Sequence, residues 1–157
     1  MKLKIIFVGK TETDYLVKGC DTYEKRLSNY LPLEVIVIPA LKNTKALNIE
    51  QQKIKEGQLI LSKLEPADML VLLDEKGKEF RSVDFAQYFQ NKMNTGLKCL
   101  CFVIGGPYGF SEEVYQKAQE KIALSKMTFS HQMIRLLLLE QCYRAMSILK
   151  NEPYHHE

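Results

Sequence analysis

Long hydrophobic runs are missing from the sequence. No apolar stretch in the 157 residues approaches the roughly 20 residues that a membrane-spanning helix needs. The amino-terminal MKLKIIFVGKTETD begins with a pair of lysines and a short apolar run, but it lacks the small-residue cleavage site of a signal peptide. We therefore expect a β-strand at the amino terminus, no membrane partner and a cytoplasmic location.

Metal-binding and disulfide patterns are also missing. Cys20, Cys99, Cys101 and Cys142 are scattered without a C-x-x-C pair, and no H-E-x-x-H or related spacing occurs. Isolated cysteines in a cytoplasmic protein are usually buried thiols. The sequence therefore predicts neither disulfides nor a metal site.

The glycines do not form a fingerprint for nucleotide phosphates. VGKT at 8–11 resembles the end of a phosphate loop, but that motif requires a glycine at position 4, where the chain has Lys4. Gly105, Gly106 and Gly109 are spaced G-G-x-x-G instead of G-x-G-x-x-G. These mismatches exclude an NTPase and disfavour an enzyme that acts on a small nucleotide.

Composition places the chain among ordinary globular proteins. Hydrophobic residues make up 46% and charged residues 26%, and the net charge is +3. That charge permits an acidic partner such as RNA without requiring one. The length suits one domain, which we take as residues 1–157.

Apolar runs alternate with segments of helical periodicity along the chain. Such alternation predicts an α/β fold with a parallel sheet covered on both faces. The expected strands are 4–8, 34–38, 69–73, 100–104 and 122–124, and the expected helices are 13–28, 49–64, 83–93, 112–119 and 132–149. Helix starts are indicated by possible capping boxes at Thr11 and Asn48 and by Ser111, and we expect 42–47 to form a mobile loop.

Ligands of open α/β sheets bind outside the carboxyl ends of the strands. This rule directs attention to 9–10, 73–74, 105–106 and 125–129. The turn GGPYG at 105–109 has two interpretations, a tight strand-to-helix connection or a place where a ligand approaches bare backbone. The segment LSKMTFSH at 124–131 is either a polar loop with Ser130 as a helix cap or a loop that buries Met127 and Phe129 against a ligand.

The last expected helix is apolar on nearly every side, which favours a subunit interface. Arg135 falls among its apolar positions and needs an anionic partner or a route to solvent, so we favour a functional role for it. Arg144 can pair with Glu140 one helical turn away. His131 in the first turn should be neutral at pH 7 because the helix dipole disfavours its charged form.

Several blocks carry a family resemblance over essentially the whole chain. IGGPYGF, LSKMTFSHQMIRLLLLEQCYRA and NEPYHHE, with the opening MKLKIIFVGK and the central LLDEKGK, resemble the bacterial RlmH family. Its members are SPOUT-class methyltransferases that modify N3 of a pseudouridine in 23S ribosomal RNA. The resemblance implies a deep trefoil knot in the carboxyl-terminal part of the α/β fold, S-adenosylmethionine as cofactor and a homodimer.

The resemblance also implies site residues, by matching positions. The cofactor would contact Leu73, Gly105, Leu124, Ser125, Lys126, Met127, Thr128 and Phe129. His131 would accept a proton or orient the base, and Arg135 or Arg144 would stabilise the anionic ring. Tyr154, His155 and His156 would hold RNA, with the partner subunit as one possible source of these three residues.

The modest charge is consistent with a substrate that is the assembled ribosome instead of naked RNA. An alternative is a non-catalytic RNA- or ribosome-binding module on the same scaffold, which would not bind S-adenosylmethionine.

Overall fold

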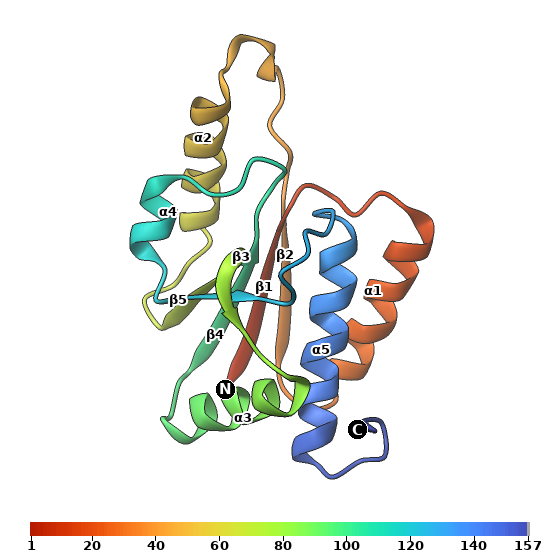
Figure 1. Ribbon diagram of the computed structural model, residues 1–157. Helices are drawn as coiled ribbons and strands as arrows, with labels where there is room; N and C mark the ends of the chain where they lie inside the picture. Colours follow the sequence, from red (N-terminus) through yellow and green to blue (C-terminus); the bar gives the residue numbers. More distant parts are fainter. Residues whose placement is uncertain (157) are drawn as a thin grey trace.

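The computed structural model describes residues 1–156, in which a five-stranded sheet of parallel strands lies between two layers of helices (Figure 1). The strand order is β2-β1-β4-β3-β5. The elements are β1 (Lys2–Val8), α1 (Asp14–Leu27), β2 (Leu33–Ile38), the 3-10 helix η1 (Thr44–Ala46), α2 (Ile49–Leu61), β3 (Asp68–Glu79), α3 (Ser82–Asn94), β4 (Cys99–Ile104), α4 (Glu112–Lys117), β5 (Glu120–Ala123) and α5 (Met133–Leu149).

Burial explains why the strand sequences are nearly continuous apolar runs. All six residues of β4, CLCFVI, are buried at the centre of the sheet, where helices cover both faces. Helices α1, α3 and α5 cover one face and α2 and α4 the other (Figure 1). The predicted α/β fold with a parallel sheet is therefore confirmed, and the four cysteines are buried free thiols as expected.

Local signals at the ends of the helices are confirmed in part. The Asn48 side chain accepts a hydrogen bond from the Gln51 N–H at 2.7 Å and completes the predicted capping box of α2. Ser111 caps α4 as expected. The capping box predicted at Thr11 is wrong: the N-cap of α1 is Thr13, and the Thr11 hydroxyl accepts a hydrogen bond from Arg135 instead. The expected loop at 42–47 contains η1.

Strand β3 continues six residues beyond the predicted end at Leu73. The extension Asp74–Glu79 carries five charged side chains and a glycine, a composition that is not typical of a strand. This extension is a strand because it pairs with the edge strand β5, and the side-chain pattern does not indicate that pairing.

A buried ion pair joins two strands at the amino edge of the sheet. Lys4 Nζ of β1 lies 2.6 Å from Asp68 Oδ2 of β3, and the two side chains are 1% and 2% exposed. Because β4 separates these strands, the pair spans the centre of the sheet. Each charge depends on the other, since water cannot solvate either.

We predict that Asp68→Asn lowers the free energy of unfolding by about 3–5 kcal/mol, because the buried Lys4 ammonium keeps only the exposed Glu65 carboxylate, 3.8 Å away, as a counterion. Urea denaturation measures the loss. The double variant Lys4→Met with Asp68→Leu is the control, and it should lose clearly less because no buried charge remains. A double variant less stable than the single one would contradict this account.

Candidate functional site

A cavity of about 560 Å³ opens at the carboxyl ends of β3, β4 and β5. This is the edge of the sheet to which the parallel topology directs ligands. Its volume lies within the usual range of about 300–1,000 Å³ for small-molecule sites. The lining comes from four segments, Leu73–Lys76, Ile104–Phe110 with Tyr115, Ile122–Ser125 and Met127–Phe129, together with His131 and Ile134.

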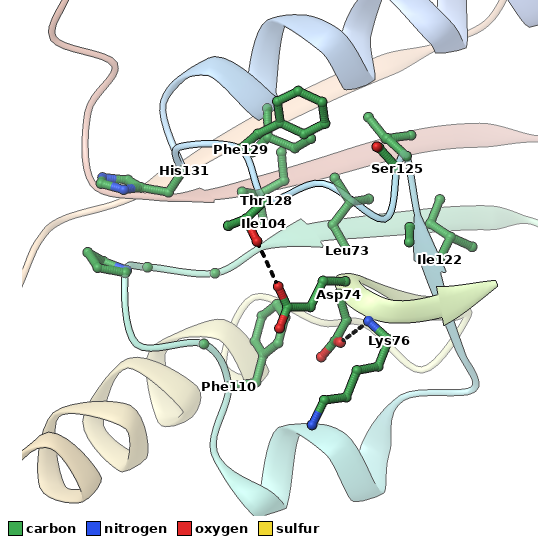
Figure 2. A pocket seen from close by; sticks show the side chains of 18 of the residues that line it. Leu73, Asp74, Lys76, Ile104, Phe110, Ile122, Ser125, Thr128, Phe129 and His131 are labelled. Carbon is green, nitrogen blue, oxygen red and sulfur yellow. Dashed lines mark hydrogen bonds between the residues drawn. The ribbon is translucent and has the colours of Figure 1, made fainter. Parts of the chain in front are cut away.

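Two loops face each other across this cavity in Figure 2. Thr128, Phe129 and His131 lie along one wall, Asp74, Lys76 and Phe110 lie along the opposite wall, and Leu73, Ile104 and Ile122 lie between them. Of the eight positions that we assigned to the cofactor, seven line the cavity: Leu73, Gly105, Leu124, Ser125, Met127, Thr128 and Phe129. The eighth, Lys126, is exposed and does not line it.

Close packing within the chain restricts Gly105 of the GGPYG turn more than Gly106, whose nearest neighbour is the flexible end of the Glu56 side chain. A Cβ at Gly105 would lie 3.1 Å from the ring of Phe110, and a Cβ at Gly106 would lie 2.9 Å from Glu56 Oε1. Both glycines also line the cavity. Of the two interpretations of this turn, the tight connection therefore has direct support, and the bare backbone at the cavity wall is compatible with a ligand approaching it.

His131 lies at the cavity wall immediately before α5. Burial lowers the pKa of its imidazole, and the nearby positive charge of Arg135 lowers it further. The ring is therefore neutral at pH 7, as expected, although burial is the largest cause. The Ser130 hydroxyl accepts a hydrogen bond from the Met133 N–H at 3.1 Å and caps the turn that leads into α5.

Arg135 is fully buried and does not line the cavity. Its guanidinium donates to the carbonyl oxygens of Val8 at 2.7 Å and Gly9 at 2.9 Å, and to the Thr11 hydroxyl at 3.0 Å. Its Nε donates to the carbonyl of His131 at 3.0 Å. The anionic partner expected for this arginine is thus replaced by backbone carbonyls, which hold α5 against the end of β1.

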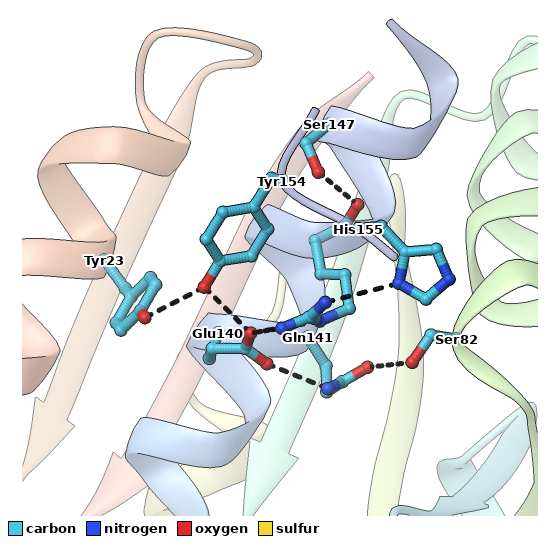
Figure 3. Close-up of polar contacts among 8 residues, drawn as sticks. Tyr23, Ser82, Glu140, Gln141, Ser147, Tyr154 and His155 are labelled. Atoms are coloured by element: carbon cyan, nitrogen blue, oxygen red, sulfur yellow. Dashed lines mark hydrogen bonds and ion pairs between the residues drawn. The ribbon is translucent and has the colours of Figure 1, made fainter. Parts of the chain in front are cut away.

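Arg144 and the carboxyl-terminal tail form a second polar cluster (Figure 3). Arg144 Nη2 lies 2.6 Å from Glu140 Oε1, and its Nη1 lies 3.2 Å from Nδ1 of His155. Tyr154 donates to the same Glu140 oxygen at 3.0 Å and lies 3.0 Å from the hydroxyl of Tyr23. Arg144, Tyr154 and His155 are therefore brought together, but none of them lines the cavity; His156 is exposed.

Three charged residues and a tyrosine that line the cavity are not among the predicted site residues. Asp74, Glu75 and Lys76 lie on the extension of β3, and Tyr115 donates its hydroxyl proton to Asp74. The signal was visible as a run of charged side chains directly after a buried strand. This run of charged residues indicates the correct edge of the sheet, but it does not indicate that the side chains line a cavity.

Residues 1–156 contain neither a metal-binding cluster nor a membrane-spanning helix. No group of three or more His, Cys, Asp or Glu residues in this part of the chain could hold a metal ion. No helix there has both the length and the apolar character required to cross a membrane.

The family model described as "Predicted SPOUT methyltransferase" matches residues 1–155. The chain belongs to the SPOUT methyltransferase family. It is 61% identical to the ribosomal RNA large subunit methyltransferase H of Parabacteroides distasonis. It is 57% identical to the proteins of that name from Bacteroides thetaiotaomicron and Flavobacterium johnsoniae. Each alignment covers 100% of both chains.

Family membership confirms the sequence resemblance and identifies the chain as an S-adenosylmethionine-dependent methyltransferase of the α/β SPOUT class, a family that implies a trefoil knot. The cavity suits this cofactor. Leu73, Ile104 and Phe129 offer apolar surface to a purine, and the carboxylates of Asp74 and Glu75 complement a ligand that carries positive charge. The volume of the cavity also exceeds what a single amino acid or base would fill.

We predict that Arg135→Met lowers the free energy of unfolding by about 2–4 kcal/mol, because the carbonyls of Val8 and Gly9 lose their buried donor. Arg144→Met is the matched control. It removes a partly exposed ion pair and should cost about 1 kcal/mol or less. Chemical denaturation compares the two, and equal losses would show that Arg135 does not anchor α5.

Proposed function

We propose that this SPOUT enzyme methylates N3 of a pseudouridine in 23S ribosomal RNA. The names of its relatives support large-subunit ribosomal RNA as the substrate. The observation that carries the proposal is a cofactor-sized cavity with a neutral histidine at its wall. A ribosomal substrate would also place the protein in the cytoplasm.

We propose that the backbone of Leu73, Gly105 and the 124–129 segment holds the cofactor, with Lys126 as the member of this segment whose side chain does not line the cavity. Bound S-adenosylmethionine supplies a methyl group that is already activated by its sulfonium. The chain must then orient the uracil ring and remove the imide proton from N3. His131, neutral and at the cavity wall, is the proposed acceptor of that proton.

The two arginines take different roles in this proposal. Arg135 is a positioning residue, since it contacts the carbonyl of His131 and the loop after β1 without reaching the cavity. Arg144 has its charge directed at Glu140 and His155, within the cluster that contains Tyr154. We assign it to the surface that stabilises the anionic ring or holds RNA.

Two subunits would complete the site. Helix α5 has 17 residues and is therefore about 25 Å long, with His131 just before its start and the tail at its far end. A chain's own Tyr154, His155 and His156 thus lie far from its own cavity. A second apolar cavity of about 250 Å³ shares Ile122–Leu124 and Phe129 with the first and includes Leu137 of α5, which supports a homodimer interface beside the site.

We predict that the purified protein methylates assembled ribosomes far faster than protein-free 23S RNA, because a small domain of modest charge depends on the shape of its substrate. Transfer of labelled methyl groups to particles that lack the modification measures both rates, and mapping of the product locates the nucleotide. Equal rates on the two substrates would refute ribosome recognition. Absence of saturable cofactor binding in calorimetry would instead favour a non-catalytic binding module.

We predict that His131→Ala slows single-turnover methylation by at least about tenfold while the affinity for S-adenosylmethionine changes little. The wild-type rate should stay level at neutral pH. It should fall only below the ordinary histidine pKa of about 6.5, because the pKa of His131 is lowered and only its neutral form accepts a proton. Unchanged single-turnover rates in the variant would remove His131 from the mechanism.

A further inference from the structure

The extension of β3 contains a bulge that enters the cavity. Ile122 of β5 pairs with both Leu73 and Lys78 of β3, so the residues between these two partners leave the regular ladder. Gly77 makes this possible, because a Cβ there would lie 2.5 Å from the backbone carbon of Ile122. Bulges commonly redirect side chains at active sites. Here the bulge places Asp74, Glu75 and Lys76 at the cavity wall.

The two carboxylates of the bulge are held differently. Asp74 accepts hydrogen bonds from the Tyr115 hydroxyl and, at 2.8 Å, from the backbone N–H of Lys76, which fix it within its own wall. Glu75 accepts a hydrogen bond at 3.0 Å from the hydroxyl of Thr128, which lies on the opposite wall (Figure 2). Glu75 therefore reaches across the space that a ligand would occupy.

The charges at the cavity wall should attract S-adenosylmethionine more strongly than its product, S-adenosylhomocysteine. Asp74 and Glu75 face one ammonium, that of Lys76, while His131 is kept neutral, so the lining is net negative. S-adenosylmethionine carries a sulfonium, an ammonium and a carboxylate, for a net charge of +1. Loss of the methyl group leaves a thioether, and the product S-adenosylhomocysteine has a net charge of zero.

We propose that Glu75 enables the pocket to distinguish the cationic methyl donor from its neutral product. A sphere of 560 Å³ is about 10 Å across, so a ligand in the cavity remains within reach of the Glu75 charge. The attraction favours the donor and falls when the methyl group has been transferred, which promotes exchange of product for fresh donor. This inference depends on the cofactor placement proposed above.

The test is isothermal titration calorimetry of S-adenosylmethionine and S-adenosylhomocysteine with wild-type protein and Glu75→Gln. The glutamine keeps an oxygen that can accept the hydrogen bond from Thr128 but removes the charge. We expect the donor to bind about threefold to fivefold more weakly and the product to change by less than about twofold. High salt screens the Glu75 charge, so it should reduce the preference of the wild-type protein for the donor over the product, as Glu75→Gln does.

Two matched variants separate charge from loop structure. Lys76→Gln removes a positive charge from the same bulge, whereas Glu75→Gln removes a negative one. Lys76→Gln should therefore increase the preference for the donor over the product. Thr128→Val removes the hydrogen bond but keeps the Glu75 charge, and it should change both affinities by the same factor. Glu75 and Lys76 are exposed, so we expect these variants to fold.

The outcomes distinguish this inference from the proposal on which it rests. If Glu75→Gln weakens both ligands equally, or Lys76→Gln shifts the preference in the same direction as Glu75→Gln, the charge mechanism is wrong while the cofactor site stands. If the wild-type protein binds neither ligand, the proposed placement of the cofactor fails.

Discussion

The site depends on one buried guanidinium. Arg135 has no exposed surface, yet its nearest acceptors are the backbone carbonyls of Val8 and Gly9, the carbonyl of His131 and the Thr11 hydroxyl. Burial of such a charge without these acceptors would cost more than a small domain can tolerate. The helix is therefore constrained to one position relative to the sheet, where the arginine meets the end of β1. The ring of Phe7 below the guanidinium adds a cation–π contact at 5.0 Å.

That constraint reaches the cavity through the residues that precede the helix. Gln132 adds two hydrogen bonds to the same loop, to the Lys10 carbonyl and from the Glu12 N–H, each at 3.0 Å. The first turn of α5 is thus attached to the segment after β1, and His131 is held with it. On the opposite wall, the β3 residues on either side of the bulge pair with β5 in the sheet. A hydrogen bond between side chains, from Thr128 to Glu75, connects these two parts across the cavity.

Periodicity and composition were sufficient to predict the layers of the fold, because strands buried on both faces have to be apolar throughout, as β4 is. They also indicated the correct edge of the sheet, since parallel strands present their carboxyl ends together. The bulge was missed because the double pairing of Ile122 depends on where β5 lies, which no local pattern encodes. The sequence shows that Arg135 is unusual, but most of its hydrogen-bond acceptors are backbone carbonyls, and no side-chain pattern indicates where a backbone carbonyl will lie.

The roles of Tyr154 and His155 follow from what their cluster does to the end of α5. Glu140, Arg144 and Tyr154 satisfy one another, and Tyr143 packs edge-on against Tyr154 with ring centroids 4.7 Å apart. The tail is thereby folded against its own helix and held away from its own cavity. Ordering the tail restricts its conformations and so costs conformational entropy, a cost that a solvated, disordered terminus would avoid. An ordered tail of this kind is consistent with the proposal that its aromatic and basic groups serve the cavity of a second subunit.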